Sequence, residues 1–190
     1  MSEAEYLLFD LEHVGEKHEF VNGEVLAMSG AHPAHSFLAA RIVLALGNRL
    51  RGRPCTVHAS DLRVQVSETG MYAYPDVVIA CGTPRFAPTR PPSLTNPRVV
   101  IEILSPTTAD YDRGAKFAHY QRIAEMQEYV LVGCPERRVE HYLRLPTGQW
   151  LLTEIGTGEV PISACAITIP LDEIYERTGV GETGEGGEAR

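Results

Sequence analysis

The sequence predicts a single mixed α/β domain, and three observations support this fold class. The apolar runs 75–81 and 98–104 are rich in β-branched residues, as central strands covered on both faces usually are. Residues 34–51 place apolar side chains at helical spacing, with Pro33 near the expected helix start. The chain has 190 residues and is 44% hydrophobic, which is enough for one domain with a substantial core.

The other elements are expected around this framework. Asn22-Gly23 between two apolar stretches predicts a β-hairpin. The full set of further elements is the first hairpin over 18–29, an alternating strand over 62–66, a helix over 109–124, a buried strand over 128–133, a second hairpin over 138–154 turned at 146–148, and a short closing helix over 170–178. The domain would span 1–178, and the Gly/Glu-rich segment 179–190 is expected to be a disordered tail.

Charge and composition limit the classes of function. The formal net charge is -8 and the pI is about 5.4, which argues against a general nucleic-acid coat protein, because such proteins are normally basic. A metal ion could still let an acidic enzyme handle nucleic acid locally. The acidic start "MSEAEYLLFD" lacks the apolar core of a signal peptide, and no apolar run approaches a membrane span. We therefore expect a cytoplasmic protein with no membrane partner.

The cysteines show no metal-binding spacing. Cys55, Cys81, Cys134 and Cys165 are far apart in the sequence, and no Cys-x-x-Cys pair occurs. This pattern argues against a zinc site built on thiolates. Reduced cysteines are the expectation for a cytoplasmic chain.

Glu102 is the most informative single residue, because it interrupts the apolar run "VVIEIL". An ionised carboxylate removed from water is costly unless a cation or hydrogen-bond donors meet it. Glu102 therefore needs a metal ion, a lysine or a solvent-filled cleft beside it.

Asp76 offers a second carboxylate for such a site. If 75–81 and 98–104 are antiparallel neighbours with Val78 across from Glu102, then Asp76 lies across from Leu104. Asp76 and Glu102 would then be diagonal neighbours on one face, with α-carbons about 7–8 Å apart. Two carboxylates at that distance repel when both are ionised, and a divalent cation between them removes the repulsion.

Lys116 has two interpretations. Together with Tyr120 and Ile123 it forms an i, i+4, i+7 series, so it lies beside the buried stripe of its helix and can lean toward Glu102. It can equally form an ordinary i, i+4 pair with Asp112 on the helix surface. Spacing alone leaves both interpretations open.

These residues carry a resemblance to a known family. Pro75-Asp76, the glutamate of "VVIEILSPTT", "DRGAKFAHY" and "EYVLV" resemble the Uma-type family of restriction-endonuclease-like proteins, a bacterial family of the PD-(D/E)XK nuclease superfamily. The likeness runs from "HEFVNGEV" to "LDEIYE". It implies a restriction-endonuclease-like mixed β-sheet core flanked by helices, with an added N-terminal hairpin and C-terminal β-hairpin.

The resemblance also implies roles for particular residues. The superfamily pattern ends in glutamate, any residue, lysine, but Leu104 occupies the lysine position here, and the family is thought to supply its lysine from the following helix, at Lys116. Asp76, Glu102 and the Ile103 carbonyl would hold Mg²⁺, with Mn²⁺ as a substitute. The implied activity is metal-dependent hydrolysis of nucleic-acid phosphodiester bonds, with DNA favoured over RNA.

Four other residues are candidates for supporting roles, each with a simpler alternative. Glu24 is either a supporting acid or a solvated hairpin residue, and Asp61 is either a further acid at the cleft or a turn residue. His35 could line the metal site or be exposed, and Tyr120 fits packing better than chemistry.

Assembly and the alternative function complete the expectations. The strong alternation of the 138–154 hairpin predicts an exposed edge that invites pairing, so we expect a homodimer. The alternative to a nuclease is a non-catalytic module on the same fold that binds nucleic acid or protein, with Glu102 and Lys116 kept as a buried ion pair.

Overall fold

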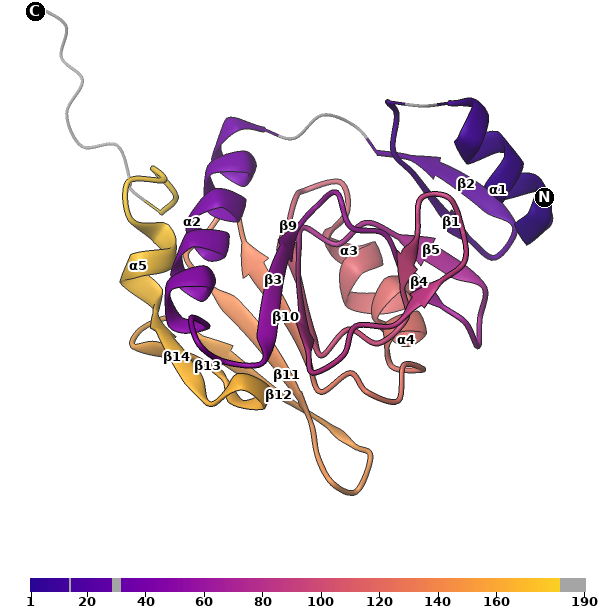
Figure 1. The fold of residues 1–190 in the computed structure, drawn as a ribbon. Coiled ribbons are helices and arrows are strands. Elements are labelled where there is room, and N and C mark those ends of the chain that lie inside the picture. Colours follow the sequence, from indigo (N-terminus) through magenta and orange to yellow (C-terminus); the bar gives the residue numbers. More distant parts are fainter. Residues whose placement is uncertain (14, 29–31, 182–190) are drawn as a thin grey trace, which may run out of the picture.

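A six-stranded mixed sheet forms the centre of the computed structural model, which describes residues 1–13, 15–28 and 32–181 (Figure 1). Its strand order is β12-β11-β10-β9-β6-β3, in which β9 and β10 are parallel and the other neighbours are antiparallel. The strands are β3 (Cys55–Ala59), β6 (Val77–Cys81), β9 (Val99–Leu104), β10 (Glu128–Gly133), β11 (Val139–Arg144) and β12 (Trp150–Ile155). The expected mixed sheet and its C-terminal hairpin are thereby confirmed.

A second six-stranded sheet, of order β2-β1-β5-β4-β8-β7, carries the N-terminal hairpin. Asn22 and Gly23 have φ angles of 52° and 87°, the positive values that a two-residue hairpin turn requires, so this predicted hairpin is confirmed. The strands are β1 (His18–Val21), β2 (Glu24–Ala27), β4 (Val64–Val66), β5 (Met71–Ala73), β7 (Phe86–Ala87) and β8 (Ser93–Leu94). Strands β7 and β8 lie in the proline-rich segment that joins β6 to β9.

Helices and a small third sheet cover the central sheet. In α2 the His32 side chain accepts the Ala34 N–H and Pro33 occupies the first turn, which explains why the helix begins there. The helical elements are α1 (Glu3–Glu12), α2 (Pro33–Arg49), α3 (Ala109–Tyr111), the π-helical turn η1 (Asp112–Lys116), α4 (Phe117–Tyr120), the 3₁₀ turn η2 (Ser163–Cys165) and α5 (Leu171–Tyr175). The third sheet pairs β13 (Glu159–Ile162) with β14 (Ile167–Pro170).

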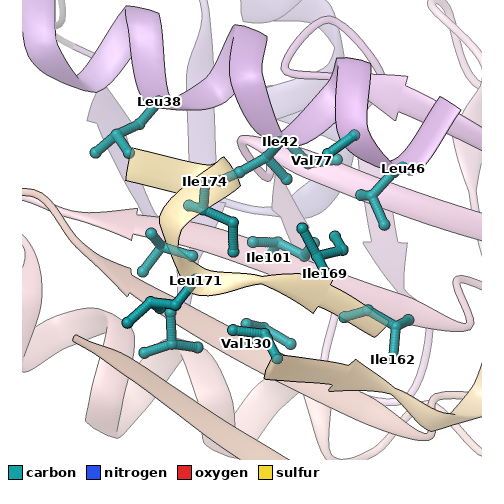
Figure 2. Close-up of a cluster of buried hydrophobic side chains, with 14 of the residues drawn as sticks. Leu38, Ile42, Leu46, Val77, Ile101, Val130, Ile162, Ile169, Leu171 and Ile174 are labelled. Carbon is teal, nitrogen blue, oxygen red and sulfur yellow. The ribbon is translucent and has the colours of Figure 1, made fainter. Parts of the chain in front are cut away.

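The two faces of the central sheet pack against different layers. Helices α2 and α5 and strands β13 and β14 cover one face, and Figure 2 shows Ile42 and Ile174 meeting Ile101 and Val130 there. Helix α4 and the second sheet cover the opposite face, where buried aromatic and aliphatic side chains such as Tyr129 gather. Of the candidate site residues, Glu102, Lys116 and Tyr120 lie on this second face, whereas His35 comes from α2 on the first.

Two boundaries differ from the sequence-based predictions. The helix expected over 109–124 ends at Tyr120 and is divided by η1. The segment 179–190 was expected to be a disordered tail, but Val180 is buried in the core cluster, so the ordered domain extends past 178. Residues 182–190 lie outside the described residues.

The expectation of reduced cysteines was wrong for two of the four residues. Cys55 and Cys81 are directly opposite each other on β3 and β6 and form a disulfide. The Cys165 sulfur lies 3.8 Å from that of Cys81. Sequence spacing missed this cluster because the sheet, and not the local chain, brings the three residues together.

Candidate active site

Glu102 lies in the middle of the central sheet, with β6 and β10 along the two edges of its strand. Glu102 is only 3% exposed to solvent. Strands β6 and β9 pair so that Val77 lies across from Ile101. Asp76 immediately precedes β6, so the same register places Asp76 directly across from Glu102. The two carboxylates therefore share one face and one end of the β6–β9 pair.

Hydrogen bonds hold the Asp76 carboxylate against β9. Its Oδ2 accepts the Ile103 N–H at 2.8 Å, and the Asp76 N–H donates to Glu102 Oε2 at 3.3 Å. From the first turn of α2, His35 Nε2 approaches Asp76 Oδ2 at 3.2 Å. The bond to Asp76 outweighs burial and raises the pKa of His35, with a smaller contribution from a hydrogen bond to the Ile103 backbone. Asp76, His35 and the Ile103 backbone thus converge beside Glu102.

The observed register corrects the expected one by two residues. The sequence-based register placed Val78 across from Glu102, but Val78 pairs with Val100. The Ile103 N–H is bonded by the Asp76 side chain and not by the backbone of β6. The backbone pairing of β6 with β9 therefore starts at Val77, one residue after Asp76. A shift of two residues keeps the same face. It moves the carboxylates from diagonal to directly opposite positions.

Lys116 reaches Glu102 from the π-helical turn η1. Such turns are rare and occur frequently at functional sites. Lys116 Nζ lies 2.9 Å from Glu102 Oε1 and 3.7 Å from Asp112 Oδ1, and all three side chains are buried. The structure therefore favours the interpretation that Lys116 faces Glu102, while the i, i+4 partner Asp112 is a longer and equally buried contact.

Glu19 is a member of this cluster that the sequence-based reasoning missed. It lies on β1 and is buried, with Oε1 2.9 Å from Lys116 Nζ and 3.1 Å from the Tyr74 N–H that donates to it. The signal was present, because Glu19 precedes the apolar pair Phe20-Val21 in a predicted strand just as Glu102 follows one. His18 and Glu19 are two adjacent polar residues, so this run lacks the continuous apolar character that makes Glu102 conspicuous.

One lysine faces more acidic side chains than it can neutralise. Burial raises the pKa of Glu102 well above its usual value, and the neighbouring acids add to that shift while Lys116 opposes it. Burial likewise raises the pKa of Asp112. Burial alone would lower the pKa of Lys116, but the surrounding carboxylates outweigh it and raise that pKa well above its usual value. The cluster therefore favours the charged form of Lys116, and it favours the protonated forms of Glu102 and Asp112 more than solvent does.

The other sequence candidates fall into two groups. Tyr120 is fully buried in α4, and its hydroxyl donates to Glu102 Oε1 at 3.3 Å, so it combines packing with a contact to the site. Asp61 bonds Lys17 at 2.6 Å with a side chain 90% exposed, and Glu24 is exposed on β2. Among the described residues, neither of these two acids contacts Asp76 or Glu102.

The Asp76–Glu102 pair fits a hard cation such as Mg²⁺. This ion is usually held by one or two carboxylates and completes its shell with water and substrate phosphates. Within the described ranges, no hydrogen bond engages Asp76 Oδ1, and the Ile103 backbone contacts both Asp76 and His35. Among the described residues, Asp76 and Glu102 form no group with a third acidic, histidine or cysteine ligand in which all ligand atoms lie within 4.8 Å of one another. The remaining ligands would come from the Ile103 carbonyl, water and substrate.

The chain is similar to several known proteins over most of its length. A family model described as "Uma2: Putative restriction endonuclease" matches residues 4–169. Two Synechocystis proteins, described as uncharacterized proteins sll1609 and slr1290, are 36% and 32% identical over 155 and 176 residues. The first alignment covers 82% of this chain and 87% of the relative, and the second covers 92% and 91%.

The fold is also similar to that of a solved structure. A crystal structure described as a putative nuclease belonging to DUF820, from Anabaena variabilis, superposes with a TM-score of 0.72. The match covers 92% of this chain and 97% of that chain at 17% identity, so it establishes the fold. Within the described ranges, no helix has the length and apolar character needed to cross a membrane.

Proposed function

Because the chain belongs to the Uma2 family, we propose that it is a magnesium-dependent endonuclease that hydrolyses nucleic-acid phosphodiester bonds, with DNA preferred to RNA. The family description and the description of the structural neighbour support a nuclease-like function. The observation that carries the proposal is the position of Asp76 directly across from Glu102, with Lys116 Nζ 2.9 Å from the latter. This combination supplies two hard oxygen ligands and one cationic side chain in a single place.

Each residue has a distinct part in the proposed reaction. Asp76, Glu102 and the Ile103 carbonyl would hold Mg²⁺, which supplies Lewis-acid activation of water and of the phosphoryl group when bound. Lys116 would orient the attacking water or stabilise negative charge that develops on the phosphate. His35 holds Asp76 Oδ2 and leaves the second oxygen of that carboxylate available.

Glu19 is best understood as a positioning residue. It bonds Lys116 at the same distance as Glu102 does, and it is itself fixed by the Tyr74 N–H. When a cation engages Glu102, Glu19 would still keep the Lys116 ammonium in place. Lys116 would then be free of Glu102 without losing every buried partner.

One observation favours the alternative, a non-catalytic module on the same fold. Glu102 and Lys116 already form a close buried pair without any metal, and Leu104 occupies the position where the superfamily pattern places its lysine. An ion pair needs only these two charges. A metal site needs Asp76 as well, so Asp76 separates the two functions.

A cleavage assay with matched variants tests the proposal. Supercoiled plasmid DNA, single-stranded DNA and RNA would be incubated with the protein in Mg²⁺ or in EDTA. We expect Mg²⁺-dependent cleavage that falls at least about 100-fold in Lys116→Met and Asp76→Asn. The chain's other lysine and its partner provide the controls, because Lys17→Met and Asp61→Asn break a surface pair and should leave cleavage unchanged.

Two results would contradict the nuclease proposal. One is the absence of Mg²⁺-dependent cleavage of all three substrates by the folded wild-type protein. The other is wild-type cleavage by Asp76→Asn, which would show that the second carboxylate takes no part and would favour the non-catalytic module.

We also propose a homodimer formed through β12. This strand is an edge of the central sheet and exposes Leu151 and Leu152 at 50% and 44%. An apolar edge strand is a natural surface for pairing with a second copy. Light scattering at micromolar concentration should give the dimer mass, and Leu151→Lys should give the monomer. A monomeric wild-type protein would remove the dimer and leave the site unaffected.

A further inference from the structure

Three cysteines from three separate elements meet on the far side of the central sheet from Glu102. Cys55 begins β3, Cys81 ends β6, and Cys165 ends η2. Their sulfur atoms all lie within 4.8 Å of one another, and they are the one cluster of three potential metal-ligating side chains among the described residues. Asp76 and Cys81 stand at opposite ends of β6, so five residues of extended chain separate the clusters by about 17 Å.

The third cysteine is the feature that a structural disulfide does not explain. Cys55 and Cys81 are joined to each other, and a disulfide needs no further sulfur. Cys165 nevertheless places an unbonded sulfur 3.8 Å from Cys81, and it is only 6% exposed. Two thiolates that share one tetrahedral Zn²⁺ at a Zn–S distance of about 2.3 Å are about 3.8 Å apart. The spacing of Cys81 and Cys165 is therefore that of two ligands of one ion.

We propose that Cys55, Cys81 and Cys165, once the disulfide is reduced, form a three-thiolate site for one thiophilic cation of the zinc class. The cluster offers three ligands and leaves the fourth position to water or an external ligand, an arrangement that zinc tolerates. Cys55 and Cys81 are only partly buried, so an ion can reach the site from solvent. Soft thiolate ligands select this cation class over Mg²⁺, so the two ends of β6 would bind different ions.

The surroundings of Cys165 supply some compensating charge. Three thiolates and one divalent cation leave a net negative charge, which a partly buried site must offset. Arg53 donates to the Cys165 carbonyl at 2.7 Å. Burial and the nearby Glu128 carboxylate raise the pKa of the Cys165 thiol, and Arg98 and Arg53 act in the opposite direction. Bound cation would lower that pKa much further.

The chemistry balances with one named co-reactant. A phosphine reductant and one water reduce the Cys55–Cys81 disulfide: the S–S bond breaks, the phosphine loses two electrons and becomes a phosphine oxide, and the water supplies the oxide oxygen and the protons of the two thiols. Binding of the divalent cation to three thiols then releases three protons to the buffer. No change of metal oxidation state is involved.

Metal titration of the reduced protein tests the proposal. Protein reduced with a phosphine would be titrated with Cd²⁺, a spectroscopic probe of thiolate coordination, and with Co²⁺ for geometry. We expect one ion per chain and charge-transfer absorbance from three thiolates. The oxidised protein should not take up the ion. Cys134→Ser is the matched control, because Cys134 is a free cysteine outside the cluster, and it should bind as wild type does.

Variants of Cys165 decide whether the third sulfur matters. Cys165→Ser and the more apolar Cys165→Ala should each weaken Cd²⁺ binding at least about tenfold and lower the absorbance to that of two thiolates, since even loss of an outer partner costs about that much. Circular dichroism would confirm that at least one of them folds. Wild-type affinity in the folded variant would overturn the proposal. So would a fully reduced protein, with all of its cysteines shown to be free thiols by mass spectrometry, that binds no Cd²⁺.

Discussion

The two faces of β9 contrast sharply although the same strand makes both. Toward α2 and α5, Ile101 and Ile103 enter a cluster of mostly aliphatic side chains, as Figure 2 shows for Ile101. Toward α4, Glu102 stands between the apolar residues Val100 and Leu104 and meets Lys116. Burial of apolar area accounts for the first face without any further partner. The second face buries more carboxyl groups than cationic groups. This excess lowers the stability of the fold unless a cation binds there.

The largest expected effect comes from removing the one buried cation of the charged face. Lys116→Met keeps the length of the side chain and leaves Glu102 and Glu19 without a counter-charge. We expect the free energy of unfolding to fall by about 3–5 kcal/mol near neutral pH, measured by urea denaturation. Lys17→Met, on the half-exposed Lys17–Asp61 pair, should change it by less than about 1 kcal/mol. Equal stability of the two variants would show that the cluster is solvated.

A slightly smaller loss of stability is expected from a substitution on the apolar face, and this substitution should leave cleavage activity unchanged. Ile101→Ala leaves a cavity among fully packed side chains and should lower the free energy of unfolding by about 2–5 kcal/mol. Cleavage per folded molecule should be unchanged, because Ile101 points away from Asp76 and Glu102. Loss of specific activity in the folded variant would contradict the claim that the apolar face contributes to stability and takes no part in cleavage.

The smallest expected effect is a pH dependence that belongs to the charged face alone. The folded pKa of Glu102 and that of Asp112 lie above the unfolded values of about 4.3 and 3.9. Their contribution to stability is therefore complete below those unfolded values and is lost as the pH rises through the raised folded values. In EDTA, this contribution should make the melting temperature fall as the pH rises above those unfolded values and through the raised folded values.

Added ions and one variant isolate the source of this pH dependence. Mg²⁺ should raise the melting temperature more at higher pH, because the ion replaces protons on the carboxylates. Glu102→Gln removes one of the shifted groups and should flatten the profile, whereas Ile101→Ala should shift it downward without changing its slope. The same slope in Glu102→Gln as in wild type would assign the pH dependence to other groups.

The sequence predicted most of the fold because its signals are local. The turn residues Asn22 and Gly23 specify the first hairpin, and a charge within an apolar run identifies Glu102. The register was wrong by two residues, since the Asp76 side chain ends the ladder through a contact that no periodicity encodes. Glu19 was not predicted because it lies on β1, which is distant in sequence from Lys116 and reaches it only in the folded chain.

The cysteine cluster was unpredictable for the same physical reason. Cys55 and Cys81 meet only through the pairing of β3 with β6, and Cys165 arrives from a separate turn. Sequence spacing reports on neighbours within an element, whereas sites assembled from several elements depend on register and packing. Both proposed ion sites are assembled from several elements. Only the first includes a residue, Glu102, whose unusual place in an apolar strand could be recognised in the sequence.

A crystal of the protein soaked in Mn²⁺, with anomalous difference density measured at the manganese edge, tests the central claim most directly. The proposed nuclease centre predicts one peak contacted by Asp76, Glu102 and the Ile103 carbonyl, with Lys116 still bonded to Glu19. The contradictory result is an absence of density between the two carboxylates while Glu102 remains paired with Lys116, which would identify the cluster as an ion pair and leave the family fold without a metal centre in this chain.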